Sequence, residues 1–314
     1  MTPWSAPQTA SAVLMIRPLH FGFNPETAAS NTFQVRPGEP PQELRAQALA
    51  ESAALHSLLS RHGVQVTVFD DLPSPQTPDA LFPNNWFSTH SDGTLVLYPM
   101  AAVNRRAERR PEFITALRRE LGVRRVLDLT GWEASGKFLE GTGSLVLDRV
   151  HRIAYAAESA RTDPAVVAAF AEALDYRPVL FATASQKGQP VYHTNVVMSL
   201  GTNAAVVCLD AIASDSQRDV LVAALRASGR QLVAITCEQM NHFAGNLLEL
   251  RSQDGQPLWV MSTQAFTALR PDQRQQLAAG AALVHTPLPT IESVGGGSAR
   301  CLLGELFHRA PPLE

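Results

Sequence analysis

The stretch Gly295–Phe307 (GGGSARCLLGELF) forms the last apolar run of the chain and carries a cysteine in its middle. Three consecutive glycines permit backbone conformations that other residues avoid, and they let a ligand approach the main chain closely. The apolar residues after them suffice for one short strand. Junctions between a loop and a strand often carry reactive groups. Most free cysteines are small buried apolar residues, so Cys301 needs partners elsewhere in the chain to be a candidate nucleophile.

The same order of elements recurs four times before this stretch. Each unit has a polar segment, a short strand, a second strand, a helix and a third strand, and the helices are expected at 111–121, 164–174, 214–227 and 263–279. The polar-to-apolar junctions fall at positions 85, 140, 195, 246 and 301, so successive steps are 55, 55, 51 and 55 residues. Such a period is typical of repeat and propeller architectures.

The final unit lacks its second strand, its helix and its third strand. Elements of these types are expected at the other end of the chain, as a strand at 11–17, a helix at 41–62 and a strand at 64–70. We therefore predict an α/β fold, a five-bladed α/β propeller of ββαβ repeats in a single domain over residues 1–314. The N-terminal strand would complete the last blade and leave no edge open. The alternative is a chance order of ordinary α/β elements. The elements that the last unit lacks are expected at the other end of the chain, which argues against chance.

The composition indicates a globular protein, with 45% hydrophobic residues and a formal net charge of −3. This charge gives no electrostatic reason to expect binding to nucleic acid or to an anionic membrane. No apolar run approaches the roughly 20 residues that span a bilayer. The three cysteines are far apart, which argues against a disulfide framework and makes Cys208 and Cys237 structural residues by expectation. Because Met1–Ser5 does not begin a signal peptide, we expect a cytoplasmic protein.

In a closed ring the five junctions would point toward one axis. The polar residues at these junctions are Asn85, Glu140, His193 with Asn195, Asn246, and Cys301. A carboxylate, an imidazole and a thiol would then meet without being neighbours in sequence. Each of these residues also has an ordinary structural interpretation, and Asn246 fits a turn cap as well as it fits a substrate contact.

The converging side chains suit covalent catalysis at a planar carbon that bears nitrogens. The thiolate is the attacking form of cysteine, and a nearby imidazole favours a thiolate–imidazolium pair. His193 can then protonate the departing nitrogen and later activate water. Glu140 is expected to accept a hydrogen bond from the other ring nitrogen and favour the imidazolium. Asn195, two residues after His193, is expected on the same face of a strand, and Asn85 and Asn195 offer amide donors and acceptors to the planar group.

No metal or cofactor is expected. The sequence has no Cys-x-x-Cys or His-Glu-x-x-His pattern, and no phosphate loop or dinucleotide fingerprint. The segment 20–40 is rich in glycine, proline and asparagine and is expected to be a long loop that covers the site.

At these residues the sequence resembles the penteins, the guanidino-group-modifying superfamily. The resemblance spans nearly the whole chain and rests on the repeat, on the glycine-rich loop before Cys301, and on the motifs FPNN (82–85), EG (140–141), SART (159–162) and HTN (193–195). It implies the five-bladed fold of arginine deiminases, dimethylarginine hydrolases and amidinotransferases. Within the superfamily, the sequence is most similar to the citrulline-utilisation hydrolases, which share FPNNW, HTN and AGNLLEL (244–250).

The resemblance also implies roles for individual residues. Cys301 matches the nucleophile, His193 the acid and base, and Glu140 the carboxylate that orients the histidine. Arg161 matches the arginine that holds the α-carboxylate of the substrate, although a surface salt bridge is its alternative. Arg17 matches an Arg-Pro pair in the first strand of the family, and the sequence leaves its role open, a purely structural one included.

A departure from the family pattern favours a neutral substrate. Arginine deiminases carry aspartates at the positions of Asn85 and Asn195, and carboxylates suit a cationic guanidinium. Amides suit a ureido group, whose oxygen needs a donor. We therefore expect hydrolysis of the small molecule L-citrulline to ornithine, ammonia and carbon dioxide through a covalent cysteine intermediate. Because related arginine dihydrolases also use asparagine here, an arginine deiminase or dihydrolase stays open, as do a dimethylarginine hydrolase, an amidinotransferase and an inactive binding protein. The sequence also leaves open whether the protein is a homodimer.

Overall fold

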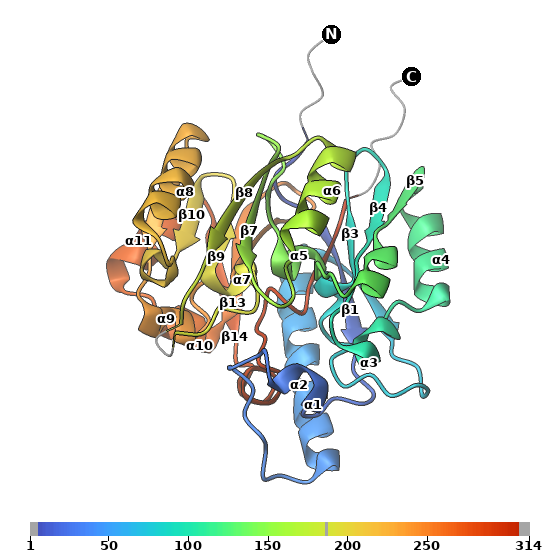
Figure 1. Cartoon of the computed structure of the whole chain (residues 1–314). Helices are drawn as coiled ribbons and strands as arrows, with labels where there is room; N and C mark the ends of the chain where they lie inside the picture. Colours follow the sequence, from blue (N-terminus) through green and yellow to red (C-terminus); the bar gives the residue numbers. More distant parts are fainter. Residues whose placement is uncertain (1–5, 186–187, 308–314) are drawn as a thin grey trace.

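The computed structural model describes residues 6–185 and 188–307 and contains five small sheets of three strands each (Figure 1). The stretch Met1–Ser5, in which no signal peptide is expected, lies outside the described residues. The strands are β1 (Ala12–Arg17), β2 (Gln65–Asp70), β3 (Phe87–Thr89), β4 (Thr94–Leu97), β5 (Arg125–Asp128), β6 (Val146–Asp148), β7 (Ile153–Glu158), β8 (Arg177–Ala182), β9 (Met198–Leu200), β10 (Ala204–Val207), β11 (Gln231–Ala234), β12 (Leu248–Arg251), β13 (Pro257–Ser262), β14 (Ala282–Thr286) and β15 (Gly304–Leu306).

The five sheets repeat one pairing pattern. In each, a first strand runs antiparallel to a middle strand, and the middle strand runs parallel to a third. A parallel pair needs a crossover connection, and a helix supplies it in every unit. These helices are α2 (Pro41–Arg61), α4 (Pro111–Glu120), α6 (Pro164–Leu174), α8 (Asp215–Ala227), and the pair α10 (Thr263–Ala268) and α11 (Pro271–Ala278). The ββαβ units expected from the period are therefore present.

The first strand of the chain completes the last sheet. β1 lies between β15 and β2, and Ala12 pairs with Leu306 while Val13 pairs with Glu305. First strands of neighbouring sheets also contact one another, as β15 does with β3, β6 with β9, and β9 with β12. The predicted completion of the last unit by the N-terminus is thus confirmed, while closure of the five sheets into a propeller stays our interpretation of the repeat.

Two local predictions were wrong. The helix expected at 263–279 is divided, because Pro271 has no N–H to donate and cannot continue a helix. The strands expected to begin at Ser144 and Val196 begin later, because one-turn helices precede them, α5 (Gly141–Ser144) and α7 (Thr194–Val197). His193 and Asn195 therefore do not share a strand. Figure 1 shows α5 and α7 near the middle of the molecule and α4, α8 and α11 toward its edges.

The remaining helical segments are short. They are α1 (Pro25–Ala28), α3 (Val103–Arg106), α9 (Cys237–Asn241), the 3₁₀ segments η1 (Pro83–Asn85), η2 (Thr130–Ser135) and η3 (Leu209–Ala211), and one π-helical turn, η4 (Ile291–Gly295). Within residues 6–185 and 188–307, no helix has the length and apolar character needed to cross a membrane.

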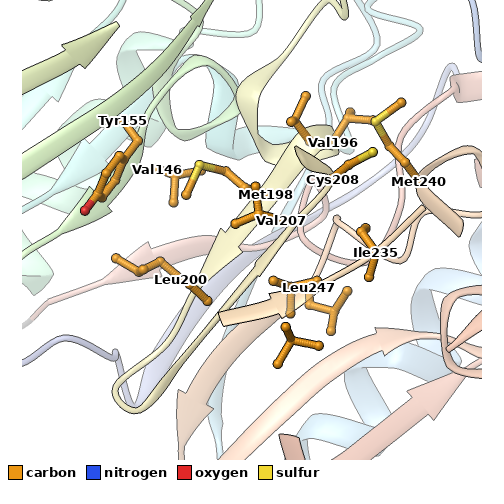
Figure 2. Packing of buried hydrophobic residues seen from close by; sticks show 14 of the residues in the cluster. Val146, Tyr155, Val196, Met198, Leu200, Val207, Cys208, Ile235, Met240 and Leu247 are labelled. Carbon is orange, nitrogen blue, oxygen red and sulfur yellow. The ribbon is translucent and has the colours of Figure 1, made fainter. Parts of the chain in front are cut away.

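The hydrophobic core is shared between sheets. Figure 2 shows Val146 of β6 and Tyr155 of β7 beside Met198 of β9 and Val207 of β10. All four side chains are buried, and Trp259 of β13 belongs to the same cluster. A three-stranded sheet alone buries little apolar surface, so each unit depends on its neighbours for stability.

A buried ion pair joins the sheet of β6, β7 and β8 to the sheet of β9, β10 and β11. Asp148 ends β6, and Arg230 directly precedes β11; Nη2 of Arg230 lies 3.1 Å from Oδ1 of Asp148, with side-chain exposures of 2% and 0%. In the turn after β6, Oδ1 of Asp148 also accepts the N–H of His151 at 2.9 Å. Removing this carboxylate would leave a buried guanidinium without its charge partner.

We predict that Asp148→Asn lowers the free energy of unfolding by about 3–5 kcal/mol, because breaking one side of a buried pair strands the other charge. Denaturant unfolding measures this. The matched control is Asp70→Asn, which breaks the exposed Arg17–Asp70 pair (2.7 Å; exposures 61% and 71%) and should change stability by less than about 1 kcal/mol. Equal effects of the two substitutions would contradict the prediction.

Candidate active site

Short turns, not strands, deliver the candidate side chains. Asn85 ends η1, Glu140 is the N-cap of α5, and His193 is the N-cap of α7. Cys301 lies in the turn before β15. Gly141 has a φ of +48°, and a Cβ at that position would collide with the main-chain oxygen of Asn84. Glycine after Glu140 therefore permits the close approach of α5 to η1 that brings the carboxylate to Asn85.

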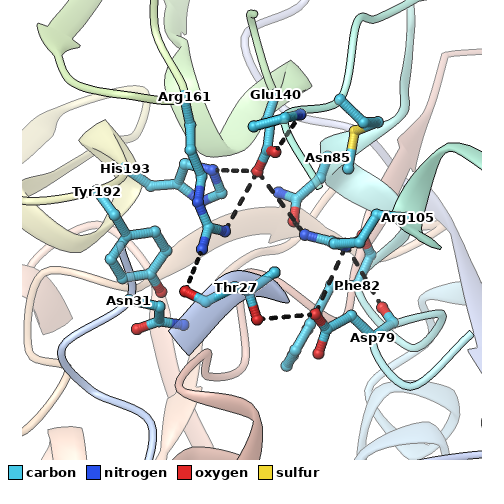
Figure 3. A network of polar contacts seen from close by, with 12 residues as sticks. Thr27, Asn31, Asp79, Phe82, Asn85, Arg105, Glu140, Arg161, Tyr192 and His193 are labelled. Atoms are coloured by element: carbon cyan, nitrogen blue, oxygen red, sulfur yellow. Dashed lines mark hydrogen bonds and ion pairs between the residues drawn. The ribbon is translucent and has the colours of Figure 1, made fainter. Parts of the chain in front are cut away.

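The thiol and the imidazole line one cavity. It contains about 250 Å³ of space not filled by atoms. Its lining residues are Asn31, Asp79, Phe82, Asn85, Arg105, Arg161, Tyr192, His193, Gly295, Gly297 and Cys301. Most of these side chains are buried, and Figure 3 shows the polar ones gathered around Glu140.

Glu140 is the centre of the charge network. Its Oε2 lies 2.8 Å from Nε2 of His193, 3.4 Å from Nη1 of Arg161 and 3.8 Å from Nη1 of Arg105 (Figure 3). Burial raises the pKa of Glu140, but Arg161, His193 and Arg105 outweigh burial and hold it well below its ordinary value. Glu140 is therefore a carboxylate that accepts the Nε2–H of His193, which leaves Nδ1 of the ring to act as the base.

His193 is neutral in the resting site. Burial is the main cause that lowers its pKa to about 4; the charges of Arg161 and Arg105 add to it, and they outweigh the opposing effect of Glu140. The imidazolium expected from the sequence is thus disfavoured before substrate binds, because the ring is buried and lies near two guanidinium groups. The imidazole can accept a proton at neutral pH.

Asn195 and Asn246 lie at the sulfur of Cys301, outside the cavity lining. Nδ2 of Asn195 is 3.5 Å from Sγ, and Nδ2 of Asn246 is 3.4 Å from it. Asn246 also has the turn-capping contact considered from the sequence, since its Oδ1 accepts the main-chain N–H of Arg300 at 3.1 Å. Both residues thus contact the nucleophile candidate directly, and their binding of substrate stays a prediction.

The segment 20–40 packs against the site and is not free of helix, because it contains α1. Nε of Arg161 lies 3.0 Å from Oγ of Ser30, and its Nη2 donates to the main-chain oxygen of Thr27 at 3.1 Å. Asn31 donates to the main-chain oxygen of Gly295 at 3.3 Å. Arg161 is thus no surface residue; it joins Glu140 to the covering segment.

Two cavity residues escaped sequence interpretation. Asp79 is buried, its Oδ1 has no hydrogen-bond partner among the described residues, and burial raises its pKa. Arg105 is held by Glu108 at 2.8 Å and donates to Oδ1 of Asn85 at 2.8 Å. Neither stands at a repeat junction, and an arginine-rich run such as 105–110 is typical of a solvated helix.

The other two cysteines lie apart from the cavity lining. Cys208 and Cys237 are free thiols whose sulfurs are 3.7 Å apart. In the described part of the chain, no group of three or more His, Cys, Asp or Glu side chains is arranged to hold a metal ion.

We predict that His193 makes stability depend on pH in acid. Its pKa is about 4 in the folded protein and about 6.5 when unfolded. The stabilisation it contributes is complete above pH 6.5 and is lost as the pH falls toward 4. Denaturant unfolding at several pH values should show a shallower decline over this window for His193→Gln than for the wild type. The exposed His62→Gln control should follow the wild type; parallel curves for all three proteins would contradict the prediction.

Comparison with known proteins gives one family. Residues 17–308 match the family profile DDAH_eukar, described as N,N dimethylarginine dimethylhydrolase, eukaryotic. No curated protein matches the sequence.

Solved structures share the fold at low identity. The N-terminal domain of ArgZ, an arginine dihydrolase from the ornithine-ammonia cycle in Cyanobacteria, has a TM-score of 0.73 and 18% identity, over 95% of this chain and 98% of that one. AgrE in a complex with L-arginine has a TM-score of 0.74 and 20% identity over 96% of this chain, which spans 41% of the AgrE chain. A dimethylarginine dimethylaminohydrolase adduct with S-methyl-L-thiocitrulline has a TM-score of 0.62 and 16% identity, over 94% and 99% of the two chains.

The match over residues 17–308 covers nearly the whole chain, and the solved structures repeat its mixed α/β arrangement of small sheets. This protein therefore belongs to the N,N-dimethylarginine dimethylhydrolase family within the pentein superfamily of guanidino-group-modifying enzymes.

Proposed function

We propose that the protein hydrolyses the ureido group of L-citrulline, giving ornithine, ammonia and carbon dioxide. The observation that carries this proposal is the amide of Asn85 in the cavity lining. Its Oδ1 accepts from Arg105 at 2.8 Å, and its Nδ2 lies 3.0 Å from Oδ1 of Asn84. Glu140 is occupied by His193 and two arginines, so it is not free to pair with a cationic guanidinium. A neutral ureido group needs no such partner.

The opposite charges in the cavity suit the α-amino and α-carboxylate groups of an amino acid. The unpartnered oxygen of Asp79 can accept an ammonium N–H, and Arg161 or Arg105 can bind the carboxylate. Figure 3 shows Arg105 between Asp79 and Glu140. Substrate would thus lie with its charged end near these residues and its ureido carbon at Cys301.

The proposed reaction steps follow from a neutral His193 and a protonated thiol at Cys301. Nδ1 of neutral His193 takes the thiol proton, and the thiolate adds to the ureido carbon. The imidazolium, stabilised by Glu140, protonates the departing nitrogen as the carbon–nitrogen bond breaks. Water, deprotonated by His193, hydrolyses the carbamoyl thioester, and the carbamate formed loses carbon dioxide to leave the second amine. The segment that contains α1 would exclude bulk water during these steps.

We predict that purified protein converts L-citrulline to ornithine and ammonia in equal amounts. Cys301→Ala should reduce turnover by at least about 10³-fold, because it removes the nucleophile. Cys208→Ala is the matched control, since this thiol does not line the cavity, and it should keep most of the activity. Amino-acid analysis and an ammonia assay measure the products. Citrulline formed from arginine, ornithine formed from arginine alone, or transfer to an amine acceptor would each replace the proposal with the corresponding alternative.

We predict that Asp79→Asn raises KM for citrulline by about 10- to 100-fold with a smaller change in kcat, because a charge-assisted hydrogen bond to the α-ammonium is lost. A citrulline analogue without the α-amino group should lose nothing further in this variant. Asp254→Asn, at an exposed aspartate, serves as the control. Steady-state kinetics with both compounds test the assignment, which an equal loss for the two compounds would overturn.

A further inference from the structure

Two side-chain amides point their nitrogens at one buried sulfur. Cys301, Asn195 and Asn246 have exposed fractions of 2%, 1% and 0%. The two Nδ2 atoms lie 3.5 and 3.4 Å from Sγ, within hydrogen-bonding range of sulfur. We propose that Asn195 and Asn246 form a two-donor hole that stabilises the Cys301 thiolate. This inference rests on Cys301 being the nucleophile of the proposed function.

The orientation of Asn246 is fixed by its neighbours. A main-chain N–H can only donate, so the atom that meets the N–H of Arg300 at 3.1 Å is the amide oxygen. Nδ2 therefore faces the main-chain oxygen of Asn195 at 2.9 Å and the sulfur at 3.4 Å. Each of its two N–H groups has one acceptor, and the second acceptor is Cys301.

The same amide distinguishes thiol from thiolate. Oδ1 of Asn246 lies 3.7 Å from Sγ, so a protonated thiol can donate weakly to it. Once the thiol loses its proton, that contact has no donor, and only the shorter contact from Nδ2 remains attractive. Ionisation thus exchanges a long S–H contact for a shorter, charge-assisted N–H contact.

Asn195 contacts the sulfur of Cys301 and also borders a second cavity. Its side chain lines a separate cavity beside Ser199 and Arg300, and its Oδ1 has no partner among the described residues. The main-chain oxygen of Asn195 accepts from Asn246, which couples the two amides. Nδ2 of Asn195 lies 3.5 Å from Sγ of Cys301.

The site needs such donors because the resting imidazole carries no charge. Burial disfavours a thiolate unless charges or hydrogen bonds oppose it. Neutral His193 removes the thiol proton but supplies no positive counter-charge until it has done so. Neutral amide donors can lower the cost of a buried anion without themselves changing protonation state, as backbone N–H groups do in oxyanion holes.

The test is titration of the thiol without substrate. Asn195→Leu removes one donor without adding charge. Asn246→Asp keeps the acceptor for Arg300 and removes the N–H donors, but its carboxylate also repels a thiolate, so its shift counts only together with that of Asn195→Leu. The ultraviolet absorbance of the thiolate and the rate of alkylation by iodoacetamide are measured against pH. A Cys301→Ser protein gives the background from Cys208 and Cys237. We expect each midpoint to move up by about one pH unit or more, a tenfold or greater loss of thiolate near neutral pH.

Ser199→Ala is the matched control, because Ser199 lines the same second cavity, and its hydroxyl has no hydrogen-bond partner, Cys301 included, among the described residues. It should titrate like the wild type, whereas a merely structural disturbance of the cavity would shift all three variants. Folded Asn246→Asp and Asn195→Leu proteins with wild-type midpoints would overturn the proposal, and Asn195→Leu alone decides if the other variant does not fold.

The titration also separates this inference from the proposed function. Shifted midpoints in a protein that does not hydrolyse citrulline support the donor hole and reject the substrate. Citrulline turnover with unshifted midpoints supports the substrate and rejects the donor hole.

Discussion

The antiparallel pairing of β15 with β1 is the constraint on which the site depends. It joins the last strand described to the first, so a sheet begun at the C-terminus is completed by residues from the N-terminus. The turn before β15 carries Cys301. Because main-chain hydrogen bonds fix the register of β15 against β1, they also fix where the thiol enters the cavity. A nucleophile near the chain end is thereby positioned as firmly as one in the middle of a domain.

The cavity that Cys301 lines concentrates opposite charges on buried side chains. Glu140 shares one carboxylate oxygen among an imidazole and two guanidinium groups, and Arg105 is in turn held by Glu108. Burial also raises the pKa of Glu108, to about 7, even though Arg105 opposes that effect. Ionised groups in such surroundings need several partners each, and the network provides them through residues from different units. Burial first, and then the charges of the two guanidinium groups, keep His193 neutral beside an anion.

The repeat period made the fold predictable, since five similar units and a complementary missing piece leave few topologies. It also located Asn85, Glu140, His193, Asn195, Asn246 and Cys301, all at junctions. The period could not indicate that Asn195 and Asn246 face sulfur, because the direction of a side chain in a one-turn helix depends on how neighbouring turns pack. Asp79 and Arg105 lie between junctions, where no periodic signal exists, and only tertiary contacts reveal them. The break at Pro271 was visible in the sequence as a residue that cannot donate within a helix.

Arg161 connects Glu140 to the segment 20–40. One edge of its guanidinium meets Glu140, and the other meets Thr27 of α1 and Ser30, which follows that helix. Any outward displacement of that segment would break the contacts of the arginine with Thr27 and Ser30 at once. The position of the segment 20–40 and the charge environment of Glu140 are therefore coupled through Arg161. The arginine keeps all of these contacts only while that segment stays in place.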